Sequence, residues 1–219
     1  FALGKNRIFR GGYPRNENLR VSPERKKVIR DYFGLEDGEK MAAYLPTHRN
    51  EGKGKNPFRT VLKQIIAKND DLKNKAKIII KPHFYEKDSL NGIPESTNVL
   101  IRYDLPFDLY EFLGATDLLI TDYSSVIFDY ELINKKIIVF PFDFEKYTTE
   151  DRGLYFQFDF IYKNVNNIEK VESIDSLIEV FTKTELYSKK DELGISLFNV
   201  PMGEYSKNIY DKLQQEINT

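Results

Sequence analysis

Short apolar runs and longer amphipathic stretches take turns along the chain. Runs of five to seven residues with apolar cores, typical of buried strands, occupy residues 41–47, 77–82, 98–102, 118–122 and 136–141. Apolar residues spaced three or four apart predict helices at residues 57–69, 107–116, 124–134, 174–187 and 204–217. Strands that alternate with helices favour a parallel sheet. We therefore expect an α/β fold, a Rossmann-like parallel sheet with helices on both faces.

Residues 1–219 are expected to form one such domain. A chain of 219 residues, 41% of them hydrophobic, is long enough for one well-buried core. No internal repeat and no low-complexity linker divides it. Residues 142–170 contain many aromatic residues and little periodicity, which predicts a long structured loop.

Basic and acidic residues nearly balance, 33 against 34, so the chain lacks the global positive field of nucleic-acid-binding proteins. The distribution is uneven, because residues 1–30 hold nine basic and two acidic residues. We interpret this stretch as a basic lead-in segment. It could face an anionic membrane surface or a polyanionic substrate, or be an ordinary solvated surface.

The composition also excludes several kinds of site. The absence of cysteine rules out disulfides and thiolate catalysis, and only two histidines, His48 and His83, argue against a histidine-rich metal centre. No metal and no obligatory cofactor are expected. No apolar run approaches the roughly 20 residues that cross a bilayer. Because the chain begins with Phe1, we interpret it as a segment of a longer protein.

Ligands of parallel α/β sheets bind at the carboxyl ends of the strands. Thr47 and Arg49 follow the first predicted strand there, and Lys81 and His83 follow the second. A histidine in this place can donate to a phosphate oxygen or transfer a proton near neutral pH. Alone, His83 could equally be a structural histidine at a strand end. The four residues are candidates for contact with a phosphorylated ligand.

A hydroxyl-rich turn follows the fourth predicted strand. Ser124 and Ser125 would lie at a helix N-terminus, where hydroxyls and free backbone N–H groups suit a diphosphate. Asp122 would repel phosphate, so we expect it to cap the helix or tether a loop. Further along, Arg152 precedes Gly153 and could neutralise a diphosphate, although alone it would be read as a surface arginine before a turn.

Five motifs together resemble the CDP-glycerol glycerophosphotransferase family, the teichoic-acid primases and polymerases of Gram-positive cell walls, with relatives in capsule synthesis. They are Gly12–Asn16, Tyr44–Arg49, Lys81–His83, Thr121–Ser125 and Arg152–Gly153. Their order resembles the family over nearly the whole chain. The resemblance implies the C-terminal, donor-nucleotide-binding half of a two-domain GT-B enzyme.

The resemblance also implies the reaction and its groups. An acceptor hydroxyl, on a lipid-linked glycan or a polyol phosphate, would attack the β-phosphorus of CDP-glycerol or CDP-ribitol, and CMP would leave. His83 matches the family's catalytic Lys-Pro-His histidine, the pair Ser124 and Ser125 its phosphate-binding serines, and Arg152 its diphosphate-binding arginine. Such enzymes work in the cytoplasm, peripherally associated with the inner face of the cell membrane.

Two positions depart from the family. An aromatic residue is usual where His48 stands and a proline where Phe84 stands, so His48 is not expected to take part in the chemistry. The family's His-Gly-Thr motif, which the resemblance implies as the source of the catalytic base, would lie upstream of Gly12. The chain alone is therefore expected to bind donor without turnover. Two alternatives stay open: a GT-B glycosyltransferase that uses a nucleotide sugar, and a non-catalytic module that binds membranes or polyanions.

Overall fold

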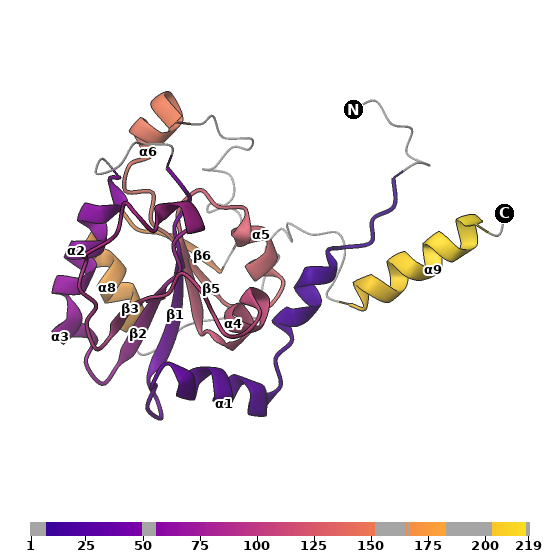
Figure 1. The fold of residues 1–219 in the computed structure, drawn as a ribbon, viewed down its shortest axis with the longest axis horizontal. Coiled ribbons are helices and arrows are strands. Elements are labelled where there is room, and N and C mark those ends of the chain that lie inside the picture. Colours follow the sequence, from indigo (N-terminus) through magenta and orange to yellow (C-terminus); the bar gives the residue numbers. More distant parts are fainter. Residues whose placement is uncertain (1–7, 50–55, 152–164, 166, 183–202, 218–219) are drawn as a thin grey trace.

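Six parallel strands form one sheet at the centre of the molecule (Figure 1). The computed structural model describes residues 8–49, 56–151, 165, 167–182 and 203–217. The strands are β1 (Lys40–Leu45), β2 (Ala76–Ile80), β3 (Val99–Ile101), β4 (Leu118–Thr121), β5 (Lys136–Val139) and β6 (Ile168–Lys170). Their order is β3-β2-β1-β4-β5-β6, which is the doubly wound order. The predicted Rossmann-like parallel sheet is confirmed.

Helices cover both faces of this sheet (Figure 1). One face packs against α2 (Phe58–Ala67), α3 (Asn69–Leu72) and α8 (Ile174–Thr182), and the other against α1 (Pro23–Tyr32), α4 (Leu109–Ala115) and α5 (Val126–Glu131). Successive residues of a strand serve opposite faces. In β1, Ala42 and Tyr44 join one buried cluster, and Met41 and Ala43 join the other. This two-sided burial explains the nearly continuous apolar strands in the sequence.

The predicted elements differ from the observed ones mainly after β5. The loop expected over residues 142–170 was wrong in part, because it contains α6 (Phe144–Lys146), a π-helical turn η4 (Tyr147–Asp151) and β6. β6 has only three residues and pairs with β5 alone, so it carries no alternating pattern that the sequence could reveal. The helix predicted over 57–69 ends at Ala67, and α3 follows as a separate turn.

The basic N-terminal stretch is not a lead-in segment within its described part. It forms a 3-10 helix, η2 (Pro14–Leu19), and α1, whose start is fixed by the Ser22 hydroxyl accepting from the backbone N–H of Arg25. On α1, the Arg25 guanidinium lies 2.7 Å from Glu111, a residue of α4. Part of the local positive charge is therefore used to dock α1 on the domain.

The predicted C-terminal helix is confirmed as α9 (Tyr205–Ile217), which lies beside η2 and away from the sheet (Figure 1). The Tyr205 ring is buried against Gly12, where a Cβ atom would lie 2.3 Å from the ring. Gly12 also has a φ of 76°, so no other residue fits there without strain. Among the helices of the described residues, none is long and apolar enough to cross a membrane.

Candidate functional site

Four neighbouring strand ends carry the candidate site. β2, β1, β4 and β5 are adjacent in the sheet, and their carboxyl ends lie together at the edge from which α6 emerges (Figure 1). The segments after them hold Lys81 to His83, Thr47 to Arg49, Asp122 to Ser125, and Asp143. The expected gathering of these segments at one edge of the sheet is observed, and hydrogen bonds or ring contacts join each to its neighbour.

Asp122 ties the loop after β1 to the end of β4. It is fully buried and accepts hydrogen bonds from the backbone N–H of Thr47 at 2.9 Å and from that of Tyr123 at 2.7 Å. The Thr47 hydroxyl donates to the same carboxylate oxygen. Asp122 thus tethers a loop, as its repulsion of phosphate suggested. Thr47 uses both of its polar donors inside the protein.

Arg49 continues this connection to β5. Its guanidinium donates to Asp122 at 2.8 Å and in a bidentate manner to Asp143, with both distances 2.8 Å. The rings of Tyr123 and Tyr147 lie 5.1 and 4.8 Å from its central carbon. Burial lowers the pKa of Arg49, but the hydrogen bonds to Asp143 and the charge of Asp122 outweigh it and raise the pKa above its ordinary value.

This geometry assigns Arg49 a positioning role. The side chain is 2% exposed, and its guanidinium also donates to the backbone carbonyl of Thr47. A buried guanidinium surrounded by two carboxylates and aromatic rings has little capacity left for a phosphate. The prediction that Arg49 contacts the donor directly stays untested, and the contacts favour a role in holding three loops in place.

Glu86, in the segment that follows β2, is the centre of a second buried group of hydrogen bonds. This carboxylate is 5% exposed and accepts from the backbone N–H of Arg49 at 3.0 Å and from the Ser89 hydroxyl at 2.7 Å. It also accepts from the Asn56 amide and lies 2.8 Å from Nδ1 of His48. With Nδ1 as the donor to Glu86, neutral His48 presents Nε2 as an acceptor.

His83 lies next to His48, with ring centroids 5.3 Å apart. Its Nδ1 accepts a long hydrogen bond, 3.4 Å, from the backbone N–H of Tyr85, which assigns the proton of the neutral ring to Nε2. Burial, the charge of His48 and that of Lys81 lower the pKa of His83 against the opposite effect of Glu86. A neutral His83 therefore offers an N–H donor beside the acceptor nitrogen of His48.

The remaining predicted residues have different surroundings. The Lys81 ammonium donates to the backbone carbonyl of Tyr103 at 3.0 Å, and burial lowers its pKa. Ser124 accepts weakly from the backbone N–H of Val126, at 3.4 Å, and Ser125 is exposed directly before α5. The serine pair thus occupies the helix start that the sequence predicted. Arg152 lies outside the described residues.

The sequence analysis did not identify two groups of the site. One is Glu86, and the other is Asp143 as the partner of Arg49. Neither has a local signal, since Asp143 is 94 residues from Arg49 and Glu86 is 38 residues from His48. Only the alignment of the strands brings these pairs together. Within the described residues, no cluster of three or more His, Cys, Asp or Glu side chains could hold a metal ion.

Comparison with known proteins identifies the family. The model of the CDP-glycerol:poly(glycerophosphate) glycerophosphotransferase family matches residues 1–213. The chain belongs to this family. This match confirms the resemblance that the five motifs carry. It also agrees with the fold and with the position of these motifs at one edge of the sheet.

Relatives of this chain are named as teichoic acid polymerases. A teichoic acid poly(glycerol phosphate) polymerase of Bacillus spizizenii is 28% identical, with 95% of this chain and 54% of that protein covered. The teichoic acid ribitol-phosphate polymerase TarK of Staphylococcus aureus is 28% identical over 87% of this chain and 37% of that protein. A structure of the wall teichoic acid polymerase TagF superposes with a TM-score of 0.76 at 24% identity, covering 99% of this chain and 54% of that one. The chain spans about half of these proteins or less.

Proposed function

We propose that this domain binds a CDP-alditol in an enzyme that transfers the alditol phosphate to an acceptor hydroxyl. Family membership supports the reaction class, and relatives are named as glycerol-phosphate and ribitol-phosphate polymerases. The observation that carries the proposal for this chain is the difference between buried and exposed polar groups at the carboxyl ends of the strands. Buried ion pairs fix the loops, while His83 and Ser125 stay exposed above them.

In this proposal the diphosphate of the donor lies over the exposed groups. Nε2–H of His83 donates to a phosphate oxygen, and the Ser124 and Ser125 hydroxyls donate to others. Arg152 and the Lys81 ammonium supply positive charge. A base outside this domain takes the proton of the acceptor hydroxyl. The acceptor oxygen forms a bond to the β-phosphorus, the bond between that phosphorus and the bridging oxygen breaks, and CMP leaves with the bridging oxygen. Catalysis of phosphoryl transfer depends mainly on such positioning and charge stabilisation.

The proposed acceptor is a lipid-linked glycan or a polyol-phosphate chain, and the proposed location is the inner face of the cell membrane. Support comes from the names of the relatives, which describe polymers of glycerol phosphate and ribitol phosphate. We also propose that the chain is the donor-binding half of a longer, two-domain enzyme. Its match to about half of the TagF chain supports this arrangement.

Calorimetric titration of the chain with CDP-glycerol, CDP-ribitol, CMP, UDP-GlcNAc and GDP-mannose tests the proposal. We expect binding of the cytidine nucleotides only, strongly reduced in His83→Ala and Arg152→Ala. The variant His83→Gln keeps an N–H donor and should retain more affinity than His83→Ala. Binding confined to UDP- or GDP-sugars would favour a glycosyltransferase instead. If no nucleotide bound even to the full-length enzyme, the proposal would be wrong.

A further inference from the structure

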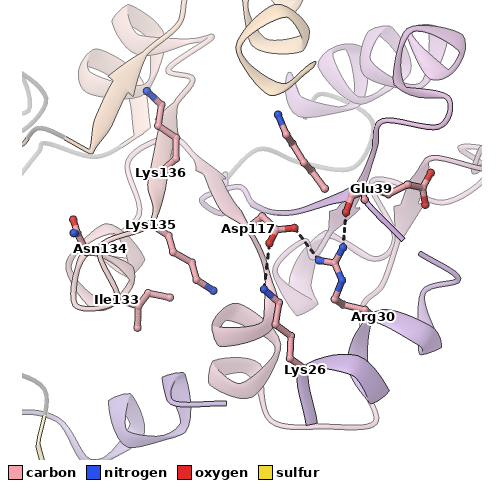
Figure 2. A pocket seen from close by; sticks show the side chains of 10 residues that line it. Lys26, Arg30, Glu39, Asp117, Ile133, Asn134, Lys135 and Lys136 are labelled. Atoms are coloured by element: carbon pink, nitrogen blue, oxygen red, sulfur yellow. Dashed lines mark hydrogen bonds and ion pairs between the residues drawn. The ribbon is translucent and has the colours of Figure 1, made fainter. Parts of the chain in front are cut away.

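A basic pocket lies at the opposite end of the sheet, where the strands begin. It has a volume of about 560 Å³ and is formed by α1, the start of β1, the residue before β4, and the turn between α5 and β5 (Figure 2). Its charged lining residues are Lys26, Arg30, Glu39, Lys40, Asp117, Lys135 and Lys136. None of these belongs to the candidate donor site. We refer to this cavity as the amino-end pocket.

Positive charge exceeds negative charge in the amino-end pocket. Asp117 is its central anion and is shared by two cations, Arg30 at 2.8 Å and Lys26 at 3.3 Å (Figure 2). Lys136 pairs with Glu169 at 2.5 Å. When Glu169 is counted with the lining residues, the pocket has five basic and three acidic side chains. One phosphate group, with one or two negative charges, would offset this surplus.

Lys135 adds a second, independent observation. Its ammonium donates to the backbone carbonyls of Gly114 and Thr116, both at 2.6 Å, and makes no ion pair within the described part of the chain. Figure 2 shows the side chain directed toward the same space as Lys26. Burial and the charges of Lys26 and Arg30 lower the pKa of Lys135 to about 8, against the opposite effect of Asp117. An anion in the pocket would relieve this repulsion.

We propose that the amino-end pocket binds a phosphodiester group of a poly(alditol phosphate) chain. The polymer's identity rests on the proposed function, whereas the pocket itself rests on Lys26, Arg30, Asp117 and Lys135. Lysine and arginine are the usual protein partners of phosphate oxygens, and here they come from separate elements of the fold. The pocket would hold a part of the polymer distant from the reacting end.

The lining of the pocket favours a flexible polyanionic chain over a membrane surface. A flat bilayer would bind a protruding basic patch with apolar side chains beside it. Here most of the charged side chains are partly buried, and Ile133 is the one apolar residue among those that line the cavity. A polyanionic chain can place single phosphates in such a recess. Its affinity would fall as salt is added, because the attraction is between opposite charges.

The experiment measures fluorescence anisotropy of labelled glycerol phosphate oligomers with the chain at low salt. Lys26→Gln removes one pocket charge, and we expect binding about fivefold weaker. Lys27→Gln is the matched control, because Lys27 is the next residue on α1, pairs with Asp31 and does not line the pocket. The double variant Lys26→Gln/Lys135→Gln should bind still more weakly, while circular dichroism confirms that each variant is folded.

The outcomes separate this proposal from that for the donor site. Loss of oligomer binding in Lys26→Gln with unchanged CDP-glycerol affinity would support the pocket. Oligomer binding without any CDP-glycerol binding, even by the full-length enzyme, would leave the pocket standing and contradict the donor site. Equal binding by the Lys26 and Lys27 variants would overturn the pocket. So would binding only to vesicles that contain phosphatidylglycerol.

Discussion

The two ends of the sheet use the same kinds of charged side chain in opposite proportions. At the carboxyl ends, one arginine, Arg49, lies between two carboxylates, Asp122 and Asp143. At the amino ends, one carboxylate, Asp117, lies between two cations, Lys26 and Arg30. The first cluster carries one excess negative charge and the second one excess positive charge.

Exposure separates the roles of the two clusters. The side chains of Arg49, Asp122 and Asp143 are at most 8% exposed, whereas those of Lys26 and Asp117 are 37% and 24% exposed. Buried charges are costly unless each has its partners, so the first cluster is a fixed support. Charges that keep contact with water can exchange partners, and the second cluster can therefore take up a ligand. Substitutions should separate the two roles.

The largest effect is expected for Arg49→Met, which leaves Asp122 and Asp143 buried without their cation. Breaking a buried ion pair from one side costs about 3–5 kcal/mol of folding free energy. Urea unfolding followed by circular dichroism measures this loss. The matched control is Arg59→Met, since Arg59 donates only to the carbonyls of Ser89 and Asn91 among the contacts described. Equal losses in both variants would contradict the supporting role of the Arg49 cluster.

The next effect is expected for Asp117→Asn, at about 2 kcal/mol, because Asp117 accepts from the backbone N–H of Met41 as well as from Arg30. Burial raises the pKa of Asp117, but these two hydrogen bonds outweigh it and hold the pKa below the ordinary 3.8. The stabilisation is therefore present above about pH 3.8 and is lost as the pH falls below it.

Urea unfolding measured at several acidic pH values tests the direction of this pH dependence. The wild-type chain should lose stability below the ordinary Asp pKa, and the difference between the wild type and Asp117→Asn should shrink there. A difference that stayed constant with pH would mean that the carboxylate charge is not what stabilises the amino ends.

The same two clusters show how far the sequence predicts this molecule. Apolar runs located five of the six strands, because each is buried on both faces. The segments at the carboxyl ends could be chosen as a site, because parallel strands bring their ends together whatever the loops contain. The strand pattern does not show which side chains pair with one another at these ends. Nothing beside Arg49 indicates Asp122 or Asp143, which lie 73 and 94 residues away.

At the amino ends of the strands, the sequence analysis missed α1 for a different reason. The start of α1 was readable, since Ser22 followed by Pro23 is a usual beginning of a helix. The density of Lys and Arg in residues 1–30 hid this signal by suggesting a solvated segment. The pairing of Arg30 with Asp117 could not be read at all, because it depends on where α1 docks.

A smaller and pH-dependent effect is expected for Lys135→Met. Loss of the hydrogen bonds to Gly114 and Thr116 should cost about 1 kcal/mol near neutral pH. Between about pH 8, the pKa in the folded chain, and the ordinary 10.5, the unfolded chain binds a proton that the folded chain does not. The Lys135 contribution to wild-type stability should therefore rise with pH over this range.

Unfolding in urea at several pH values within this range measures that slope, which Lys135→Met should lack. Glycerol phosphate oligomers sharpen the test. A bound anion favours the charged ammonium, so saturation of the wild-type chain should reduce the slope. An equal slope in the wild type and the variant would show that Lys135 is not the titrating group.

The smallest effect is expected for Lys27→Gln, which breaks an exposed pair with Asp31 at 2.8 Å on the surface of α1. Such exposed pairs contribute little, because water and salt screen the two charges. Lys26→Gln changes the net charge of the same helix by the same amount, but it removes a partner of the less exposed Asp117. Any excess loss of stability or of oligomer binding in Lys26→Gln, measured beside Lys27→Gln, must therefore come from the place of the charge. Equal losses would mean that the amino ends respond only to total charge, and the contrast between the two ends would fail.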